Sequence, residues 1–454
     1  MSSSPPRPHE TRSAASSETD PPRIVIVGAG FGGLACAKAL GGYGVRVTIV
    51  DRNNYHLFIP LLYQVATAAL SPADIAEPIR RILHRYSNIE KVVMGEVTGI
   101  DTDERKLRLA AGGCVDYDRL VIATGSAENY FGHDDWAEEA PGLKSLTDAR
   151  AIRARVLLGF ERAELSTDRE EQAALTTIVI VGGGPTGVEM AGAVAELARW
   201  TLRRDFRNID PRSATIMLVE AGPRLLSGFP ESLAAYARHR LERLGVHILT
   251  GQTVNEINAQ GAVIGDKKVR AHAVIWAAGV KASPAGGWLK VDTDKQGRIP
   301  VNPDLSVKGL HHVYALGDTA SFPGEDGKPL PALAQVAEQQ GAHLGRGLAS
   351  QLEKGKALAP FRFHDRGNTA VIGRSAAIFD FGKWRLKGWF AWLLWAIVHI
   401  YLLIGFEKRV LVGVQWFWRW LTYQRGARLI LSDVPPEEIS PREASEGTHP
   451  SPSH

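Results

Sequence analysis

The chain has 454 residues, enough for two or three domains with sizeable cores. Its 53 basic and 49 acidic residues give a net charge of +4 at pH 7, so the charge balance gives no indication of a nucleic-acid partner. The two cysteines, Cys36 and Cys114, cannot form a disulfide framework and are typical of a reducing compartment. We expect Cys36 to pack in the core.

Both ends of the chain have the composition of disordered tails. Residues 1–21 and 432–454 are rich in Ser, Pro and charged residues. The first stretch has no apolar core of signal-peptide length, so we interpret it as a tail and not as a secretion signal.

The rest of the chain is organised around a glycine-rich turn after a buried strand. Residues 24–27 are β-branched and apolar, and Gly28, Gly30 and Gly33 follow at G-x-G-x-x-G spacing. Gly28 permits a tight turn, Gly30 lets a pyrophosphate approach the backbone, and Gly33 lets the next helix pack closely. The pattern predicts a dinucleotide site. The alternative is a glycine-rich turn in an unrelated α/β protein.

Two later stretches complete this first nucleotide module. Residues 47–50 form a second strand, and Asp51 at its end is placed to accept a hydrogen bond from a ribose 2′-OH. Residues 117–126 form another buried strand that runs into a turn containing Ala123 and Gly125, where it can close over a bound nucleotide.

A second fingerprint has Gly182, Gly184 and Gly187 in the three glycine positions. Glu220 ends its second strand and is the matching acid. A carboxylate there favours NADH over NADPH because it would repel a 2′-phosphate, although Arg224 nearby leaves NADPH open.

The two modules are alike in a further respect. Residues 272–279 repeat the pattern of residues 120–125, and each ends in Ala-x-Gly, the second at Gly279. Two similar modules indicate a duplication. Two dinucleotides in one chain imply electron transfer between them, and one of the two is then usually a flavin.

Two polar patterns follow the second module. A strand ends in Gly317 and Asp318, and an acid there can hydrogen-bond a polyol chain. Gln335 and Gln339 are i, i+4 neighbours on one face of a predicted helix. Taken alone, such a pair is more typical of a solvated face than of a ligand site.

Together these motifs resemble the two-dinucleotide-binding-domain flavoproteins, and more narrowly the type II (single-subunit) NADH:quinone oxidoreductases. The disulfide reductases of that superfamily carry a redox cysteine pair after the first acid, and residues 52–66 contain none, so a dithiol relay is not expected. The narrower resemblance rests on motifs at residues 28–33, 54–64, 182–189, 315–318 and 334–340 and on the Trp-rich C-terminus.

The resemblance implies an α/β fold with two Rossmann-like domains, the NADH domain inserted in the FAD domain, and a C-terminal helical membrane-anchoring segment. The implied boundaries are FAD-binding parts at 22–174 and 300–380, the second including the quinone region, an NADH-binding domain at 175–299, and membrane-associated helices at 381–431. FAD is implied at Gly28, Gly30, Gly33, Asp51, Ala123, Gly125, Gly317 and Asp318, and NADH at Gly182, Gly184, Gly187, Glu220 and Gly279.

The same resemblance implies three catalytic positions. Gln335 and Gln339 would lie near the isoalloxazine and the quinone headgroup. Glu189, at the start of the second Rossmann helix, would serve the proton side of quinone reduction. An equally weighted reading makes Glu189 a first-turn acid that complements the helix dipole.

The apolar stretch 388–406 contains three tryptophans and is flanked by Lys and Arg. Its length fits a spanning helix, but its Trp residues run into the segment instead of forming belts. The Trp and basic content, with a second Trp-rich stretch up to Trp420, fits a pair of interfacial helices. A buried helix or a homodimer contact is the third reading. The family resemblance, in which the C-terminus is a monotopic anchor, favours the interfacial reading.

The predicted function is transfer of two electrons from NADH, through FAD, to a membrane quinone (ubiquinone or menaquinone) without proton pumping. The predicted location is peripheral, on the cytoplasmic face of the cell membrane. No metal-ligand cluster has convincing spacing. Three alternatives stay open: a soluble NADH-dependent ferredoxin or rubredoxin reductase, the weaker one of a sulfide:quinone oxidoreductase, and a membrane-bound NADH sensor without turnover.

Overall fold

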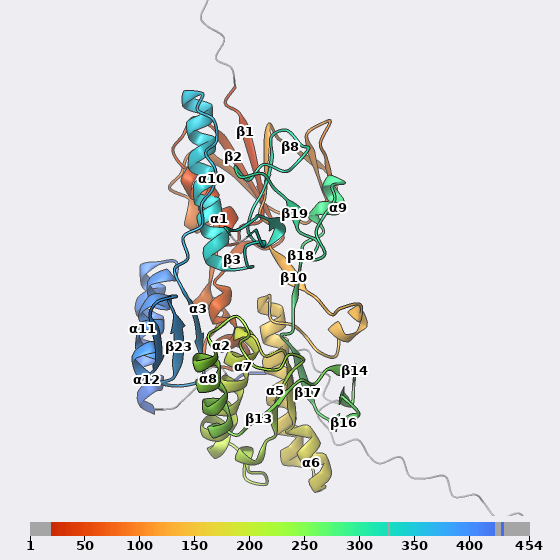
Figure 1. The fold of residues 1–454 in the computed structure, drawn as a ribbon. Coiled ribbons are helices and arrows are strands. Elements are labelled where there is room, and N and C mark those ends of the chain that lie inside the picture. The colour runs from red at the N-terminus through yellow and green to blue at the C-terminus, as the bar shows by residue number, and fades with distance from the viewer. Residues whose placement is uncertain (1–19, 326, 423–427, 431–454) are drawn as a thin grey trace, which may run out of the picture.

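The computed structural model describes residues 20–325, 327–422 and 428–430. The predicted tail at 432–454 lies outside the described residues, as does all of the N-terminal tail up to residue 19. Figure 1 shows two lobes, one above the other, with the C-terminal strands and helices packed along one side.

A five-stranded parallel sheet forms the first lobe, in the order β20-β9-β1-β2-β5. The β-branched run of β1 is completely buried at its centre, as the sequence predicted. The strand bounds are β1 Arg23–Val27, β2 Arg46–Asp51, β5 Ile89–Met94, β9 Arg119–Ile122 and β20 Val313–Ala315. Helix α1 (Phe31–Leu40) packs beside the long helix α10 (Ala334–Lys354), and Cys36 is buried between them as expected.

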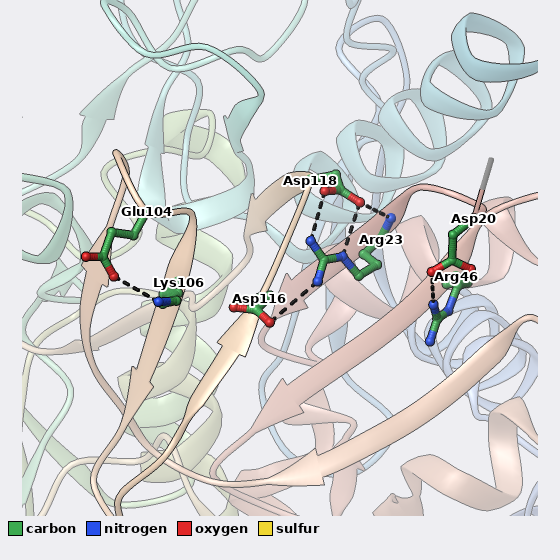
Figure 2. A network of polar contacts seen from close by, with 7 residues as sticks. All are labelled: Asp20, Arg23, Arg46, Glu104, Lys106, Asp116 and Asp118. Atoms are coloured by element: carbon green, nitrogen blue, oxygen red, sulfur yellow. Dashed lines mark hydrogen bonds and ion pairs between the residues drawn. The ribbon is translucent and has the colours of Figure 1, made fainter.

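Ion pairs fasten this sheet at the end opposite the glycine turn. Figure 2 shows Arg23, at the start of β1, held by the carboxylates of Asp118 and Asp116. The Asp118 carboxylate also accepts the backbone N–H of Arg23 at 2.7 Å. Arg46, at the start of β2, pairs with Asp20 at 2.7 Å. The strands themselves pair in parallel, so their carboxyl ends meet at one edge of the sheet.

A four-stranded parallel sheet forms the second lobe, in the order β13-β12-β11-β17. Its bounds are β11 Ile178–Val181, β12 Ile216–Glu220, β13 Val246–Thr250 and β17 Ala273–Trp276. Helices α7 (Pro185–Glu196), α8 (Glu231–Arg243) and α5 (Leu146–Leu165) pack with this lobe. Helix α5 ends before residue 175, the predicted start of the NADH domain. This helix therefore packs with the second lobe although it lies in the stretch that we assigned to the FAD-binding part.

Both sheets build the duplicated α/β plan that the motifs predicted. The second sheet lies within the sequence of the first, because β20 returns to pair with β9 after the second lobe is complete. The strands β10 (Ser126–Glu128) and β18 (Val280–Ala282) pair antiparallel where the chain passes between the lobes. Small antiparallel sheets complete the lobes: β6 Val97–Asp101, β7 Lys106–Leu109 and β8 Cys114–Asp116 in the first, and β14 Val254–Asn258, β15 Gly261–Ile264 and β16 Lys267–Arg270 in the second.

One predicted helix is wrong. The sequence predicts one helix over residues 71–86, with Ser71 as its cap and Pro72 at its first helical position. The structure instead has α3 (Pro72–Ile75), then strand β4 (Ala76–Pro78), then α4 (Ile79–Leu83). The break has a local cause, because Pro78 has no N–H and its ring clashes with a preceding helical turn. Strand β4 pairs instead with β3 (Tyr55–Leu57). The Ser71 cap and Pro72 at the first helical position are confirmed.

The C-terminal part consists of a three-stranded antiparallel sheet and two helices. The strands are β22 (Asn368–Val371), β23 (Ala377–Asp380) and β24 (Arg385–Gly388), and the helices are α11 (Trp389–Leu402) and α12 (Phe406–Thr422). Among the described residues, no helix has the length and apolarity needed to cross a membrane.

Candidate active site

The first fingerprint forms the turn that its glycines predicted. Gly28 has φ +96°, and a Cβ there would lie 2.4 Å from the carbonyl oxygen of Ala123. A Cβ on Gly33 would lie 1.8 Å from the carbonyl oxygen of Gly28. A Cβ on Gly30 would meet no atom within 4 Å, so the N-terminus of α1 faces open space at this position. That space and the free N–H groups of the helix end fit a pyrophosphate.

The second fingerprint repeats this geometry. Gly182 has φ +112°, and a Cβ there would lie 2.4 Å from the carbonyl oxygen of Ala277. A Cβ on Gly187 would lie 1.8 Å from the Gly182 oxygen, whereas one on Gly184 would meet nothing within 4 Å. The N-terminus of α7 is therefore open in the same manner, and the residues fit a second dinucleotide.

The two predicted acids brace these turns. Asp51 Oδ2 accepts the N–H of Ala29 at 2.7 Å, and burial is the main cause that raises the pKa of Asp51. Glu220 accepts the N–H groups of Gly183 and Gly222, each at 2.6 Å. A carboxylate has about four acceptor positions, so both acids keep capacity for a ribose hydroxyl.

The carboxyl ends of β9 and β20, at the same edge of the sheet as the first turn, bring the other predicted flavin residues together. Ser126 Oγ donates to Oδ2 of Asp318 at 2.6 Å. The Gly317 N–H donates to Oε1 of the buried Gln340 at 2.7 Å, and the Gly125 carbonyl accepts the hydroxyl of Thr319 at 3.1 Å. A small hollow lies beside Gly317, Asp318 and Gln340.

Gly279, the last predicted nucleotide residue, lies in the connection to β18. Its carbonyl accepts the N–H of Asn129 at 3.1 Å. A Cβ on Gly279 would lie 2.8 Å from the ring of Phe131, so a larger residue would need this exposed ring to move.

A separate cavity lies where α7 meets the C-terminal helices and the short helix α2 (Leu62–Ala66). The space between its walls is about 820 Å³, including the open solvent at its mouth. Two acids, Glu189 and Glu196, and five tryptophans share its wall. The lining residues are Tyr63, Gln64, Thr67, Ala69, Glu189, Ala193, Glu196, Trp200, Thr201, Val371, Gly373, Arg374, Trp392, Trp395, Trp416 and Trp420.

Glu189 is a titratable group of this cavity whose pKa is far from its ordinary value. Its Oε1 accepts the backbone N–H of Val371 at 3.2 Å. Loss of hydration among the surrounding protein atoms raises the pKa of Glu189 to about 8. The carboxyl therefore holds a proton at neutral pH.

The reading of Glu189 as a first-turn acid is wrong. Helix α7 begins at Pro185, and its first turn contains no acidic residue. Glu189 lies beyond that turn and faces the cavity, where a proton donor is useful and a contribution to the helix dipole is small.

Gln335 and Gln339 lie at the start of α10 and are absent from the cavity wall. Gln335 Nε2 donates to the carbonyl oxygen of Gly367 at 3.1 Å, and its Oε1 accepts the N–H of Arg366 at 3.0 Å. Gln339 exchanges two hydrogen bonds with the backbone of His364, at 2.9 and 3.1 Å. Both side chains thus hydrogen-bond the segment that leads into β22, and the structure does not bring them together with Glu189.

Sequence reasoning missed most of the cavity wall. Gln64 and Tyr63 belong to a motif that we quoted without assigning them a role. For Trp395 the sequence did give a signal, because a Trp inside an apolar segment and not at its end is not typical of a membrane belt. In the structure Trp395 is 2 % exposed and stacks on His399, with ring centroids 4.3 Å apart. Glu196, just before the π-helical turn at Leu197–Thr201, and Trp200, within it, gave no sequence signal.

The C-terminal helices are docked onto the body of the protein by polar contacts. Lys408 pairs with the buried Glu77 of β4 at 2.7 Å, and Arg81 pairs with Glu407 at 3.4 Å. Trp416 also stacks on Trp395, with centroids 5.0 Å apart. Among the described residues, no group of three or more His, Cys, Asp or Glu side chains is arranged so that it could hold a metal ion.

Two glycine turns of this geometry in one chain are typical of an oxidoreductase that binds two dinucleotides. The sequence profile of the pyridine nucleotide-disulphide oxidoreductases matches residues 22–341. Two type II NADH:quinone oxidoreductases of Mycobacterium tuberculosis, Ndh and NdhA, are each 38 % identical, and the alignments cover 90 % and 91 % of this chain and 90 % of each relative. The chain belongs to this family, as a member of its type II NADH:quinone oxidoreductase branch.

The fold comparison agrees with this assignment. The structure of NDH2 from Plasmodium falciparum in complex with NADH superimposes with a TM-score of 0.82 at 21 % identity, covering 89 % of this chain and 99 % of that one. At this identity the likeness speaks for the shared fold.

Proposed function

We propose that the cavity beside Glu189 receives a quinone headgroup and that the two fingerprints hold a flavin and NADH. The chain is an NADH:quinone oxidoreductase that transfers two electrons from NADH to a quinone and does not pump protons. The observation that carries the cavity assignment is the position of Glu189, whose carboxyl group lies in the wall of a largely aromatic cavity formed partly by the C-terminal helices.

FAD is the flavin that we propose at the first fingerprint. A two-part nucleotide fits the open N-terminus of α1, with Asp51 for a ribose, and the hollow at Asp318 suits a polyol chain. A bound flavin would supply the step that joins a hydride donor to a quinone. The protein residues bind, orient and exclude water around these groups.

NADH is proposed at the second fingerprint. Gly184 leaves room for the pyrophosphate, and Glu220, held by two backbone N–H groups, accepts a ribose hydroxyl. The same carboxylate disfavours a 2′-phosphate, which supports NADH over NADPH.

Reduction of a quinone by NADH consumes one proton from solution, and Glu189 passes this proton to the quinone. Its carboxyl is protonated at neutral pH, and its Oε1 is held by Val371, so the proton can be presented to a ligand in the cavity. A direct role for Gln335 and Gln339 toward the quinone stays a prediction; their hydrogen bonds give them a positioning role, because they fix the segment that leads into β22 and Val371.

The C-terminal helices are proposed to rest on the membrane surface, on the cytoplasmic face. Large apolar side chains are exposed along them: Trp389, Phe390, Leu393, Ile397, Tyr401, Val410, Leu411, Val414, Phe417, Trp418 and Leu421. Lys383, Arg385 and Lys387 stand beside this apolar surface, as in an interfacial element that meets headgroups. Contact with lipid would give a membrane-dissolved quinone access to the cavity. The homodimer stays a prediction.

Purified protein in detergent tests this function. NADH oxidation is followed with a short-chain quinone as acceptor, and the nucleotide released on denaturation is identified by chromatography. We expect quinone-dependent turnover and release of FAD. Absence of quinone-dependent turnover would contradict the assignment, and release of FMN would contradict the choice of FAD.

A further inference from the structure

Gln64 is a polar side chain of the cavity wall whose orientation is fixed by its neighbours. It lies on α2, is 9 % exposed and lines the cavity. Its Oε1 accepts the indole N–H of Trp416 at 3.0 Å, and its Nε2 donates to the hydroxyl oxygen of Tyr63 at 3.1 Å. An indole N–H can only donate, so its partner has to be the amide oxygen. Trp416 thereby decides which way the amide of Gln64 faces.

In this orientation one N–H group of the Gln64 amide has no partner in the described part of the chain. The amide nitrogen carries two N–H groups, and Tyr63 uses one of them. Among the described residues the second N–H makes no hydrogen bond. Trp395, on the same cavity wall, also has a buried indole nitrogen without a partner in the described part of the chain. Buried donors are normally satisfied, so unused donors at a cavity indicate that a ligand supplies an acceptor there.

We propose that Gln64 binds a carbonyl oxygen of the quinone through its Nε2, with Trp416 as the positioning residue that holds the amide in this orientation. This inference rests on the proposed function and deepens it by naming a substrate contact. A quinone oxygen accepts hydrogen bonds. If the Gln64 amide were flipped, its own oxygen would face the quinone oxygen, and binding would be weaker. Gln64 on α2 and Glu189 on α7 then contact the ligand from two different elements of the wall.

The contact also connects the quinone site to the proposed membrane surface. Trp416 belongs to α12, whose Phe417 and Trp418 are exposed at 65 % and 57 %. The helix that meets lipid therefore also orients a donor inside the cavity. Helix α2, which packs against α5 and α7 of the second lobe, supplies the donor, and the C-terminal helix fixes it, so the site is complete only when the two are docked.

The test uses the full chain with its flavin and the variants Gln64→Met and Trp416→Phe, with Gln172→Leu as a matched control. Gln172 bonds the carbonyl oxygens of Ala163 and Ser166 and lies outside the cavity. Infrared difference spectra are recorded for a short-chain quinone carrying a ¹³C carbonyl, bound to the oxidised enzyme. Flavin reduction by NADH and reoxidation by the quinone are timed separately.

We expect the band of one bound carbonyl to move to higher frequency in Gln64→Met, because a hydrogen bond to that oxygen is lost. The KM for quinone should rise about 3- to 10-fold, the usual effect of one neutral hydrogen bond, while flavin reduction by NADH keeps its rate. Trp416→Phe should raise the KM in the wild-type background and have no further effect in Gln64→Met, since both act through one contact. The control should match the wild type.

An unchanged carbonyl band in Gln64→Met would overturn the proposal, even with an altered KM, because a purely structural role of Gln64 can change the KM but not the carbonyl bond. Additive effects of the two substitutions would overturn the role of Trp416. Failure of the proposed function is distinguishable, because the wild-type flavin would then not be reoxidised by quinone at all.

Discussion

The backbone N–H of Val371 donates to Oε1 of Glu189 at 3.2 Å, and this bond joins β22 of the C-terminal sheet to α7 of the second lobe. It leaves the other carboxyl oxygen available to carry the proton that burial stabilises. The acid of the proposed quinone site is thus positioned by a segment that Gln335 and Gln339 fix from the first lobe.

Quinone reduction should depend on pH through Glu189. Its pKa is about 8, so the donating, protonated form is lost as the pH rises above that value. We expect kcat/KM for quinone to fall about tenfold per pH unit well above pH 8, and Glu189→Gln to be slower by about 100-fold at pH 7 with no such pH dependence. Steady-state rates between pH 6 and about 10 measure this. A Glu189→Gln enzyme with the wild-type profile would remove Glu189 from the reaction.

The same carboxyl should make the stability of the protein depend on pH. Glu189 is protonated in the folded state up to about pH 8 but in an unfolded chain only up to about its ordinary 4.5. The folded state therefore binds more protons between these values, and the free energy of unfolding declines as the pH rises through this window. Urea titrations measure the free energy of unfolding of both proteins at pH 5 and pH 9. Relative to the wild type, Glu189→Gln should be more stable at pH 9 than it is at pH 5. Equal differences at both pH values would contradict this.

Two alanine substitutions in the second fingerprint should separate binding from folding. A Cβ on Gly184 meets no protein atom, so Gly184→Ala should keep its melting temperature yet lose NADH affinity, because the methyl occupies the space of the pyrophosphate. A Cβ on Gly187 lies 1.8 Å from a backbone oxygen, so Gly187→Ala should lose about 1–3 kcal/mol of stability. Calorimetry and the KM for NADH measure both effects. A Gly184→Ala protein that binds NADH normally would place the nucleotide elsewhere.

Membrane association should depend on the exposed apolar side chains of α11 and α12. Phe417→Glu places a charge on this surface and should weaken binding to vesicles, while turnover of a water-soluble quinone in detergent persists. Met94→Glu is a matched control, because Met94 is 68 % exposed on β5 of the first lobe. Co-sedimentation with vesicles is the measurement. Equal loss of binding in both variants would point to charge alone and not to this surface.

The parts of the fold that were predictable are those fixed by local chemistry. Gly28 and Gly182 have positive φ beside a backbone oxygen, a geometry that demands glycine, and strands such as β1 and β11 are continuous apolar runs. The error at residues 71–86 was also local, since Pro78 gave a signal against a continuous helix.

The cavity could not be predicted, because its wall comes from segments far apart in the sequence. Gln64 is orientated by Trp416, 352 residues later, and Glu189 is held by Val371, 182 residues later. Neither pair has a spacing that sequence periodicity can detect. The i, i+4 pattern of Gln335 and Gln339 correctly placed both on one helix face, but their partners at residues 364–367 became visible only in three dimensions.

The central claim is that electrons pass from NADH to a quinone within this chain, and anaerobic stopped-flow absorbance of the flavin tests it most directly. Detergent-purified protein is mixed first with NADH and then with a short-chain quinone. We predict rapid bleaching of the flavin by NADH and full recovery on addition of quinone. Bleaching without recovery would contradict quinone as the acceptor, and absence of a bound flavin would contradict the assignment of the first fingerprint.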